Sequence, residues 1–141
     1  ASVISKKKRI RQMLKKVQHD LAYNPPNKFK GSILDGRDIG TVIMPDAHVK
    51  VYLTASLNVR AMRRYKEYKK MGIKTTLGRV KSDIKKRDYE DTHRKISSLK
   101  PAKDAVLLDS SFYNTKAAFV EIDEVIRNEI KRLNATKHKS L

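Results

Sequence analysis

The sequence predicts an α/β fold in which helices flank a small parallel sheet. Three observations predict it: short apolar runs typical of buried strands, longer stretches with helical apolar periodicity, and the alternation of the two along the chain. Because parallel strands are joined by crossovers that usually contain a helix, this alternation favours βαβ units with helices over both faces of the sheet. With 141 residues, the chain has the length of one domain or of part of one.

Four helices are expected, over residues about 3–22, 56–71, 77–93 and 119–133. In the first, apolar residues recur three and four positions apart from Ile10 to Leu21, which places them on one helical face. Gly72 is expected to end the second helix. The last is expected to run for about four turns, with a frayed tail over residues 134–141.

Three short strands are expected, over residues 32–34, 48–53 and 105–108. The first and third are compact apolar runs bounded by turn or acidic residues, and both are expected to be buried. β-branched valines mark the second. A sheet this small, entered from a long helix rather than from a hairpin, leads us to expect that neighbouring strands lie outside this chain.

Composition excludes several classes of site and favours an anionic partner. The 33 lysines and arginines exceed the 15 aspartates and glutamates by 18 charges, and such a field attracts nucleotides, phosphorylated metabolites, nucleic acids or anionic membranes. The chain has no cysteine, which excludes disulfides and thiolate metal sites, and its 4 histidines are too scattered to predict a metal cluster. No apolar run is long enough for a signal peptide or a membrane span, so a cytoplasmic protein is expected.

A charged segment with two glycines, residues 34–41, follows the first expected strand. In an open α/β sheet, ligands usually bind beyond the carboxyl ends of the strands. Arg37 offers a planar guanidinium for phosphate oxygens, and Asp38 offers a carboxylate that accepts from an amino group. The alternative interpretation is an Asx-type turn with a surface ion pair.

Arg87, Asp91 and Arg94 share one face of the third expected helix, at about 100° per residue. That face continues the apolar stripe that begins at Leu77. The helix is therefore expected to bury its first half and to aim two guanidiniums and a carboxylate inward. A solvent-exposed ion pair between residues four apart is the alternative.

Arg60, Arg63 and Arg64 form a third cluster, three and four positions apart on the second expected helix. Like charges this close favour a bound anion, and phosphoryl transfer requires cations over the phosphates. A solvated basic face is the alternative for such a run.

Several ungapped motifs, taken in order, resemble those of bacterial cytidylate kinases. They are Asp35-Gly36-Arg37-Asp38-Ile39-Gly40-Thr41, Pro45-Asp46-Ala47, Leu53-Thr54-Ala55-Ser56, Arg60-Ala61-Met62-Arg63-Arg64, Arg87-Asp88-Tyr89-Glu90-Asp91 and Pro101-Ala102-Lys103-Asp104-Ala105, with Leu108-Asp109. They keep the family's order and nearly its spacing over residues 1–133. The resemblance implies the parallel sheet of P-loop nucleoside monophosphate kinases, represented by its C-terminal part, in one domain over 1–141 with a lid at about 57–93.

The resemblance also implies transfer of a phosphoryl group from ATP, with Mg²⁺, to CMP or dCMP. Ser2 and Arg11 would face the cytosine together with Asp38. Arg37 and Arg94 would hold the CMP phosphate. These nucleotides would be the partners of a monomer that binds neither a membrane nor a specific nucleic acid.

Further roles follow from the same resemblance. Arg87 and Asp91 would sit near the CMP phosphate and the sugar hydroxyl. Arg60 would bind ATP from one arm of the lid, where Arg63 and Arg64 would be the phosphate ligands. Arg63, Arg64 and Arg87 would thus be the catalytic cations.

The chain departs from the family pattern at its front. None of its 5 glycines is followed by Lys and then Ser or Thr, so the phosphate-binding P-loop motif is absent. The insert that closes over CMP is also absent, and Ser97-Ser98 stands where Ala-Pro is usual. The simplest interpretation is a chain that begins partway through a longer kinase, and we expect these 141 residues alone to be inactive.

Two alternatives remain open from the sequence. The basic first helix and the surplus of 18 charges are also typical of a nucleic-acid-binding module. The second alternative is a kinase for another pyrimidine monophosphate such as UMP, against which Ser2, Arg11 and Asp38 are the discriminating residues.

Overall fold

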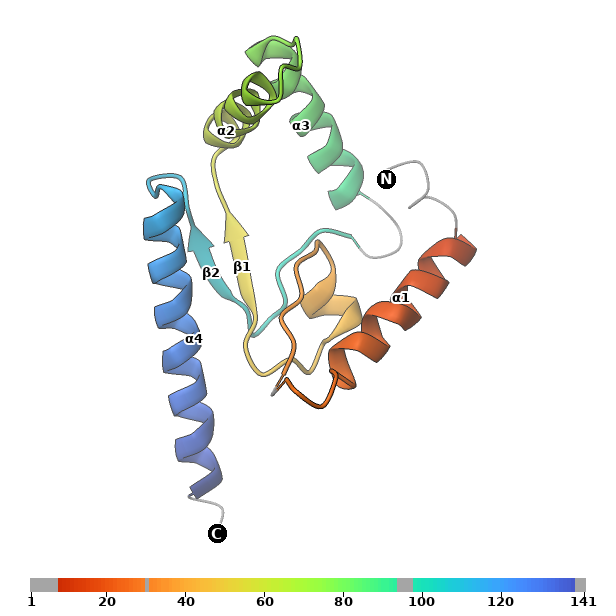
Figure 1. Cartoon of the computed structure of the whole chain (residues 1–141), viewed down its shortest axis with the longest axis vertical. Coiled ribbons are helices and arrows are strands. Elements are labelled where there is room, and N and C mark those ends of the chain that lie inside the picture. The colour runs from red at the N-terminus through yellow and green to blue at the C-terminus, as the bar shows by residue number, and fades with distance from the viewer. Residues whose placement is uncertain (1–7, 30, 94–97, 139–141) are drawn as a thin grey trace.

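The computed structural model describes residues 8–29, 31–93 and 98–138 and has a mixed α/β fold (Figure 1). The elements are α1 (Lys8–Tyr23), the π-helix η2 (Ile39–Ile43), β1 (Val51–Thr54), α2 (Leu57–Lys70), α3 (Leu77–Thr92), β2 (Val106–Asp109) and α4 (Thr115–His138). A parallel pair of strands flanked by helices confirms the predicted fold class.

The sheet consists of β1 and β2 in parallel, in a register that pairs Val51 with Val106 and Thr54 with Asp109. In the view of Figure 1, α4 runs beside the sheet, and the hairpin of α2 and α3 lies beyond the carboxyl ends of the strands. The α1 helix and η2 lie on the other side of the strands from α4. The two later strand predictions are therefore confirmed, with bounds shifted towards the C-terminus.

The strand predicted over residues 32–34 is wrong. Gly31 to Asp35 have no regular secondary structure, and Ile33 is 95% exposed. The Ser32 hydroxyl instead donates to the Ala22 carbonyl of α1 at 2.7 Å. Three apolar residues without a neighbouring strand have no ladder to join, so this segment follows the end of α1 as irregular chain.

The strands are also less buried than predicted. Leu53 in β1 is 52% exposed and Leu107 in β2 is 65% exposed. Parallel strands are usually covered on both faces, but here two strands of four residues offer little surface for helices to cover. The buried apolar residues of the described chain are small or medium-sized: Ala22, Ile43, Ala55, Ala61 and Val80.

The α2–α3 hairpin matches its prediction closely because its ends carry capping residues. The Ser56 hydroxyl accepts from the amide of Val59 at 3.3 Å, and the Thr76 hydroxyl accepts from the amide of Arg79 at 3.2 Å. Ala61 and Val80 are buried in these two helices. Leu77, which the pattern predicts as buried, is exposed on the first turn of α3.

Gly72 ends α2 as predicted, in a Schellman motif. It has a φ of +71°, its amide donates to the carbonyl of Lys69 at 3.1 Å, and the next amide, from Ile73, donates to Tyr68 at 2.9 Å. A side chain at this φ would be strained, so glycine is required for the turn.

The terminal helices differ from their predicted bounds. Within the described residues α1 begins at Lys8, and the predicted helical residues 3–7 lie outside that range. The last helix runs from Thr115 to His138, so the prediction of a frayed tail is wrong for residues 134–138. The Asn114 side chain caps the first turn of α4 by accepting from the amide of Ala117 at 2.9 Å.

The sequence pattern missed the short π-helix η2. Its hydrogen bonds run over five residues, from the amide of Ile43 to the carbonyl of Asp38 at 3.3 Å and from Met44 to Ile39 at 2.7 Å. Such a short segment has no periodicity for a pattern to detect.

In the described part of the chain, none of the helices combines the length and apolarity that crossing a membrane demands.

Two glycine substitutions test the turn between α2 and α3. Gly72→Ala is expected to lower the free energy of unfolding by about 1 kcal/mol, because an L side chain disfavours positive φ. Gly78→Ala, in the first turn of α3 with nothing within 4 Å of the added Cβ, is expected to raise it by about 0.5 kcal/mol. Urea denaturation of both variants measures the difference, and equal effects would contradict the role of φ.

Candidate functional site

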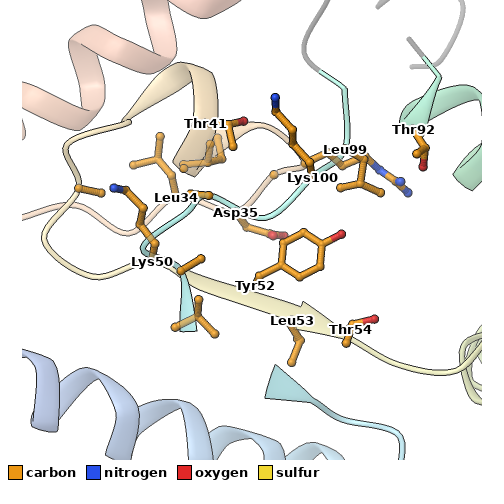
Figure 2. Close-up of a pocket in the computed structure, with 18 of the residues that line it drawn as sticks. Leu34, Asp35, Thr41, Lys50, Tyr52, Leu53, Thr54, Thr92, Leu99 and Lys100 are labelled. Atoms are coloured by element: carbon orange, nitrogen blue, oxygen red, sulfur yellow. The ribbon is translucent and has the colours of Figure 1, made fainter. Parts of the chain in front are cut away.

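A cleft of about 820 Å³ opens beside β1 (Figure 2). Its walls come from the segment after α1, from β1 itself, from the last turns of α3 and from the chain that enters β2. In Figure 2, the ring of Tyr52 extends from β1 towards Asp35, and Lys100 and Leu99 lie across from them. The polar side chains that line it are Asp35, Arg37, Thr41, Lys50, Tyr52, Thr54, Arg60, Arg87, Asp88, Thr92 and Lys100.

Lys50 fixes the floor of the cleft. Its side chain is 6% exposed, and its Nζ donates to the Pro45 carbonyl and to Asp104 Oδ2, both at 2.5 Å. A Cβ on Gly40 would lie 3.3 Å from Lys50 Cδ, so the absence of a side chain lets η2 approach this lysine closely. One buried ammonium therefore joins η2, the start of β1 and the segment before β2.

This contact lowers the pKa of Asp104. The hydrogen bond from Lys50 holds the pKa of the Asp104 carboxyl below its ordinary value of 3.8, and a backbone hydrogen bond acts in the same direction. Lys50 can be buried because its charge is paired with Asp104 and two of its hydrogen-bond donors are occupied. Sequence reasoning missed Lys50, since a single lysine before a strand gives no signal that it turns inward.

Arg37 projects from the segment before η2 towards the carboxylates of α3. Its Nη1 lies 2.5 Å from Asp91 Oδ2 and 3.9 Å from Asp88 Oδ1. Arg87 Nε lies 3.8 Å from the same Asp91 oxygen. The structure thus brings together three residues that the sequence placed in two separate clusters, and Asp91 is the most enclosed of them, with its side chain 14% exposed.

Arg60, on the first turn of α2, reaches Asp88 from the neighbouring helix. Its Nη1 donates to Asp88 Oδ2 at 2.6 Å, and its Nε donates to the Ala55 carbonyl at 2.9 Å. The two oxygens of Asp88 therefore face two different arginines. The sequence motif contained Asp88, but the pattern assigned it no role.

A second cavity, of about 390 Å³, lies between α2 and α3. Its polar lining consists of Arg37, Arg60, Arg63, Arg64, Glu67, Tyr68, Asp83, Arg87 and Asp88. Five guanidiniums around one cavity form a site suited to several phosphate oxygens.

The three arginines of α2 differ in what they contact. Arg63 donates to Ser110 Oγ at 3.1 Å and to the carbonyls of Ser110 and Tyr113 at 2.6 and 2.8 Å. Arg64 lies 3.3 Å from Glu67 on its own helix and is half exposed. Arg63 is thus held by hydrogen bonds to the segment that follows β2. Arg64 pairs with an exposed glutamate, and a phosphate could take the place of that glutamate.

Ser110 is the second residue that sequence reasoning missed. It is 4% exposed, its amide donates to the Thr54 carbonyl at 2.8 Å and its hydroxyl donates to the same oxygen at 3.0 Å. It therefore extends the parallel pairing by one residue and accepts from Arg63. A serine after a strand carries no sequence signal for this link.

Some predicted site residues fall outside these contacts. Ser2 and Arg94 lie outside the described residues, as does the side chain of Arg11. Asp38 precedes η2 and its carbonyl accepts from the amide of Val42 at 2.9 Å, but it is not among the residues that line the cleft. The predicted roles of these residues stay predictions.

Within residues 8–29, 31–93 and 98–138, no group of three or more histidine or acidic side chains is placed to hold a metal ion. Three acids at the site, Glu67, Asp88 and Asp91, are instead paired with guanidiniums. The described residues therefore fit the phosphates of a nucleotide better than a metal bound by protein alone.

Comparison with known proteins identifies relatives of this chain. The sequence profile of the cytidylate kinase family matches residues 1–132. A cytidylate kinase of Streptococcus mutans is 43% identical over 123 residues, covering 87% of this chain and 52% of the relative. One from Ligilactobacillus salivarius is 44% identical over 132 residues (94% and 53%), and one from Thermosipho melanesiensis is 39% identical over 131 (93% and 58%). The chain spans about half the length of the curated relatives it matches.

The contact between Lys50 and Asp104 predicts a pH-dependent contribution to stability. Because the folded-state pKa of Asp104 is depressed, the stabilisation is present above its ordinary value of 3.8 and is lost as the pH falls through the folded value. Asp104→Asn is therefore expected to lower the free energy of unfolding at pH 7, by an amount that vanishes in strong acid. Urea denaturation between about pH 7 and pH 2 measures it.

Asp20→Asn, on the exposed surface of α1, is the control for a general loss of negative charge. A difference between Asp104→Asn and the unaltered chain that stays constant down to the most acidic condition would contradict the ion pair.

Proposed function

The chain belongs to the cytidylate kinase family. We propose that the protein catalyses phosphoryl transfer from ATP to CMP or dCMP. In this reaction an oxygen of the acceptor phosphate attacks the γ-phosphorus, and ADP leaves as the γ-phosphoryl group is transferred, giving CDP or dCDP. The observation that carries the proposal is the group of guanidiniums from three separate elements around paired carboxylates at the junction of two cavities.

The 820 Å³ cleft is proposed to hold the acceptor nucleotide. Arg37 would exchange its contact with Asp91 for the acceptor phosphate, and Arg94 would bind the same phosphate. Arg87 and Asp91 would lie near this phosphate and the sugar hydroxyl. The exchange is favourable because a guanidinium that already pairs with a carboxylate loses little when a doubly charged phosphate takes its place.

Selection of cytosine is proposed to depend on Ser2, Arg11 and Asp38. A carboxylate accepts the hydrogen bond of the exocyclic amino group of cytosine, whereas uracil offers a carbonyl oxygen at the same position. A site built to pair with a donor rejects the analogue that lacks it, because the buried acceptor is then left unpaired.

The α2–α3 hairpin is proposed to be the lid over ATP. Arg60 and Arg64 would bind the donor phosphates, where cations stabilise the charge that spreads over the equatorial oxygens in the transition state. Mg²⁺ carried by ATP would supply further neutralisation of that charge. The three hydrogen bonds from Arg63 to Ser110 and Tyr113 support a role for Arg63 in holding α2 in place rather than in touching ATP.

We further propose that the protein works in the cytoplasm as a monomer. Both cavities are formed within one chain, and each proposed substrate is a nucleotide of the cytoplasmic pool.

Substituting Asp38→Asn, in the protein at its natural length, tests base selection. The ratio of kcat/KM for CMP over UMP is expected to fall by about tenfold or more, because the amide loses the charge and one acceptor that favour the amino group. Steady-state turnover with each nucleotide measures the ratio, with Asp20→Asn as a control on α1. An unchanged preference for CMP would count against Asp38, and absence of CMP turnover in the unaltered protein would count against the function.

The polypeptide of 141 residues alone is expected to show no measurable CMP turnover. Without a Gly-Lys-Ser or Gly-Lys-Thr sequence, it offers the β- and γ-phosphates no amide cradle and no P-loop lysine. A coupled assay with CMP and MgATP on a mass-verified sample measures this. Turnover at the rate usual for a kinase, about 1 per second or faster, would overturn the expectation.

A further inference from the structure

Asp88 occupies an unusual position between the two cavities. Four of the described residues line both cavities, and three of them are arginines: Arg37, Arg60 and Arg87. Asp88 is the fourth, and therefore the one carboxylate that the two cavities share among the described residues. Its side chain is 29% exposed, so it is partly shielded from water.

Each oxygen of Asp88 faces an arginine from a different part of the chain. Oδ2 accepts from Arg60 of α2 at 2.6 Å, and Oδ1 lies 3.9 Å from Arg37 of the segment before η2. Arg60 is also held through its Nε by the Ala55 carbonyl at 2.9 Å, so its guanidinium is fixed on two sides. Asp88 thus lies between these two cations, with a close contact to Arg60 and a longer one to Arg37.

We propose that Asp88 is a positioning residue that sets the separation and orientation of Arg37 and Arg60. This inference rests on the proposed function, in which Arg37 binds the acceptor phosphate and Arg60 the donor phosphates. Transfer requires an oxygen of the acceptor phosphate to lie close to the γ-phosphorus and in line with the bond that breaks. The cations that bind the two phosphates must therefore stand at a defined distance from each other. Asp88 supplies that constraint while touching neither nucleotide.

The alternative is an ion pair that only stabilises the fold, and charge distinguishes the two. Removing the charge of Asp88 leaves the site more positive, so each anion binds at least as tightly as before. The same change frees the guanidiniums to reorient, which weakens the interactions made only in the transition state. A residue that binds substrate directly would show the opposite, a weaker binding of nucleotide.

Kinetics of the Asp88→Asn variant, in the protein at its natural length, provide the first test. We expect kcat to fall by about tenfold to a hundredfold, the range for a misplaced catalytic group, with KM for CMP and for ATP unchanged or lower. Asp123→Asn is the matched control, because it breaks an aspartate–arginine pair with Arg127, 2.7 Å apart, on α4. Thermal unfolding of both variants checks that any loss exceeds the unfolded fraction.

A double-mutant cycle tests whether Asp88 acts through Arg60. In an Arg60→Gln background, Asp88→Asn is expected to change kcat by less than about threefold, because the group it positions is already absent. Additive effects of the two substitutions would overturn the proposal. A rise in KM without a fall in kcat would overturn it as well.

Titration with inorganic pyrophosphate, followed by calorimetry, separates this inference from the proposed function. Asp88→Asn is expected to bind pyrophosphate about two- to fivefold more tightly than the unaltered protein, since a competing carboxylate is removed at a partly exposed site. Tighter binding in a protein that does not turn over CMP would overturn the function and retain the placement of Asp88 between two anion-binding arginines. Unchanged or weaker pyrophosphate binding would overturn the inference whatever the turnover.

Discussion

The candidate site depends on the pairing of arginines with the two carboxylates that α3 presents. Asp91 lies 2.5 Å from Arg37 and Asp88 lies 2.6 Å from Arg60, so one helix holds a guanidinium from the segment before η2 and another from α2. In a chain with 18 surplus positive charges, guanidiniums this close would otherwise repel one another. The carboxylates allow cations to gather around two cavities before any phosphate is bound.

The partners of an arginine indicate whether it is available to a ligand. Arg37 pairs with Asp91 and Arg64 with Glu67, and a phosphate can replace either carboxylate because its oxygens also accept hydrogen bonds from a guanidinium. Arg63 donates to two backbone carbonyls, at Ser110 and Tyr113, and these would be left unsatisfied if it moved. Arg63 and Arg64 are adjacent in the sequence and look equivalent there, but only Arg64 is available to bind a phosphate without leaving backbone carbonyls unsatisfied.

The sequence predicted what depends on local pattern and missed what depends on the tertiary arrangement. The bounds of α2 and α3 and the end of α2 at Gly72 follow from local sequence, and they were predicted correctly. The strand proposed around Ile33 failed because three apolar residues acquire strand structure only beside a partner. Lys50 and Ser110 were missed because their roles arise from carbonyls and acids far away in the chain, at Asp104 and Thr54.

Polar links, more than apolar packing, fix the geometry of this site. Large apolar side chains such as Leu53 and Leu107 remain half or more exposed, and the buried core is made of small and medium-sized residues. Hydrogen bonds and ion pairs position the segments instead. Lys50 joins three segments at the floor of the cleft, and Asp88 contacts two arginines at its rim. Such contacts contribute modestly to stability but strongly to orientation. At Asp88, which is partly exposed, a substitution should therefore alter catalysis more than folding stability, whereas loss of the buried Lys50 contacts should affect stability as well.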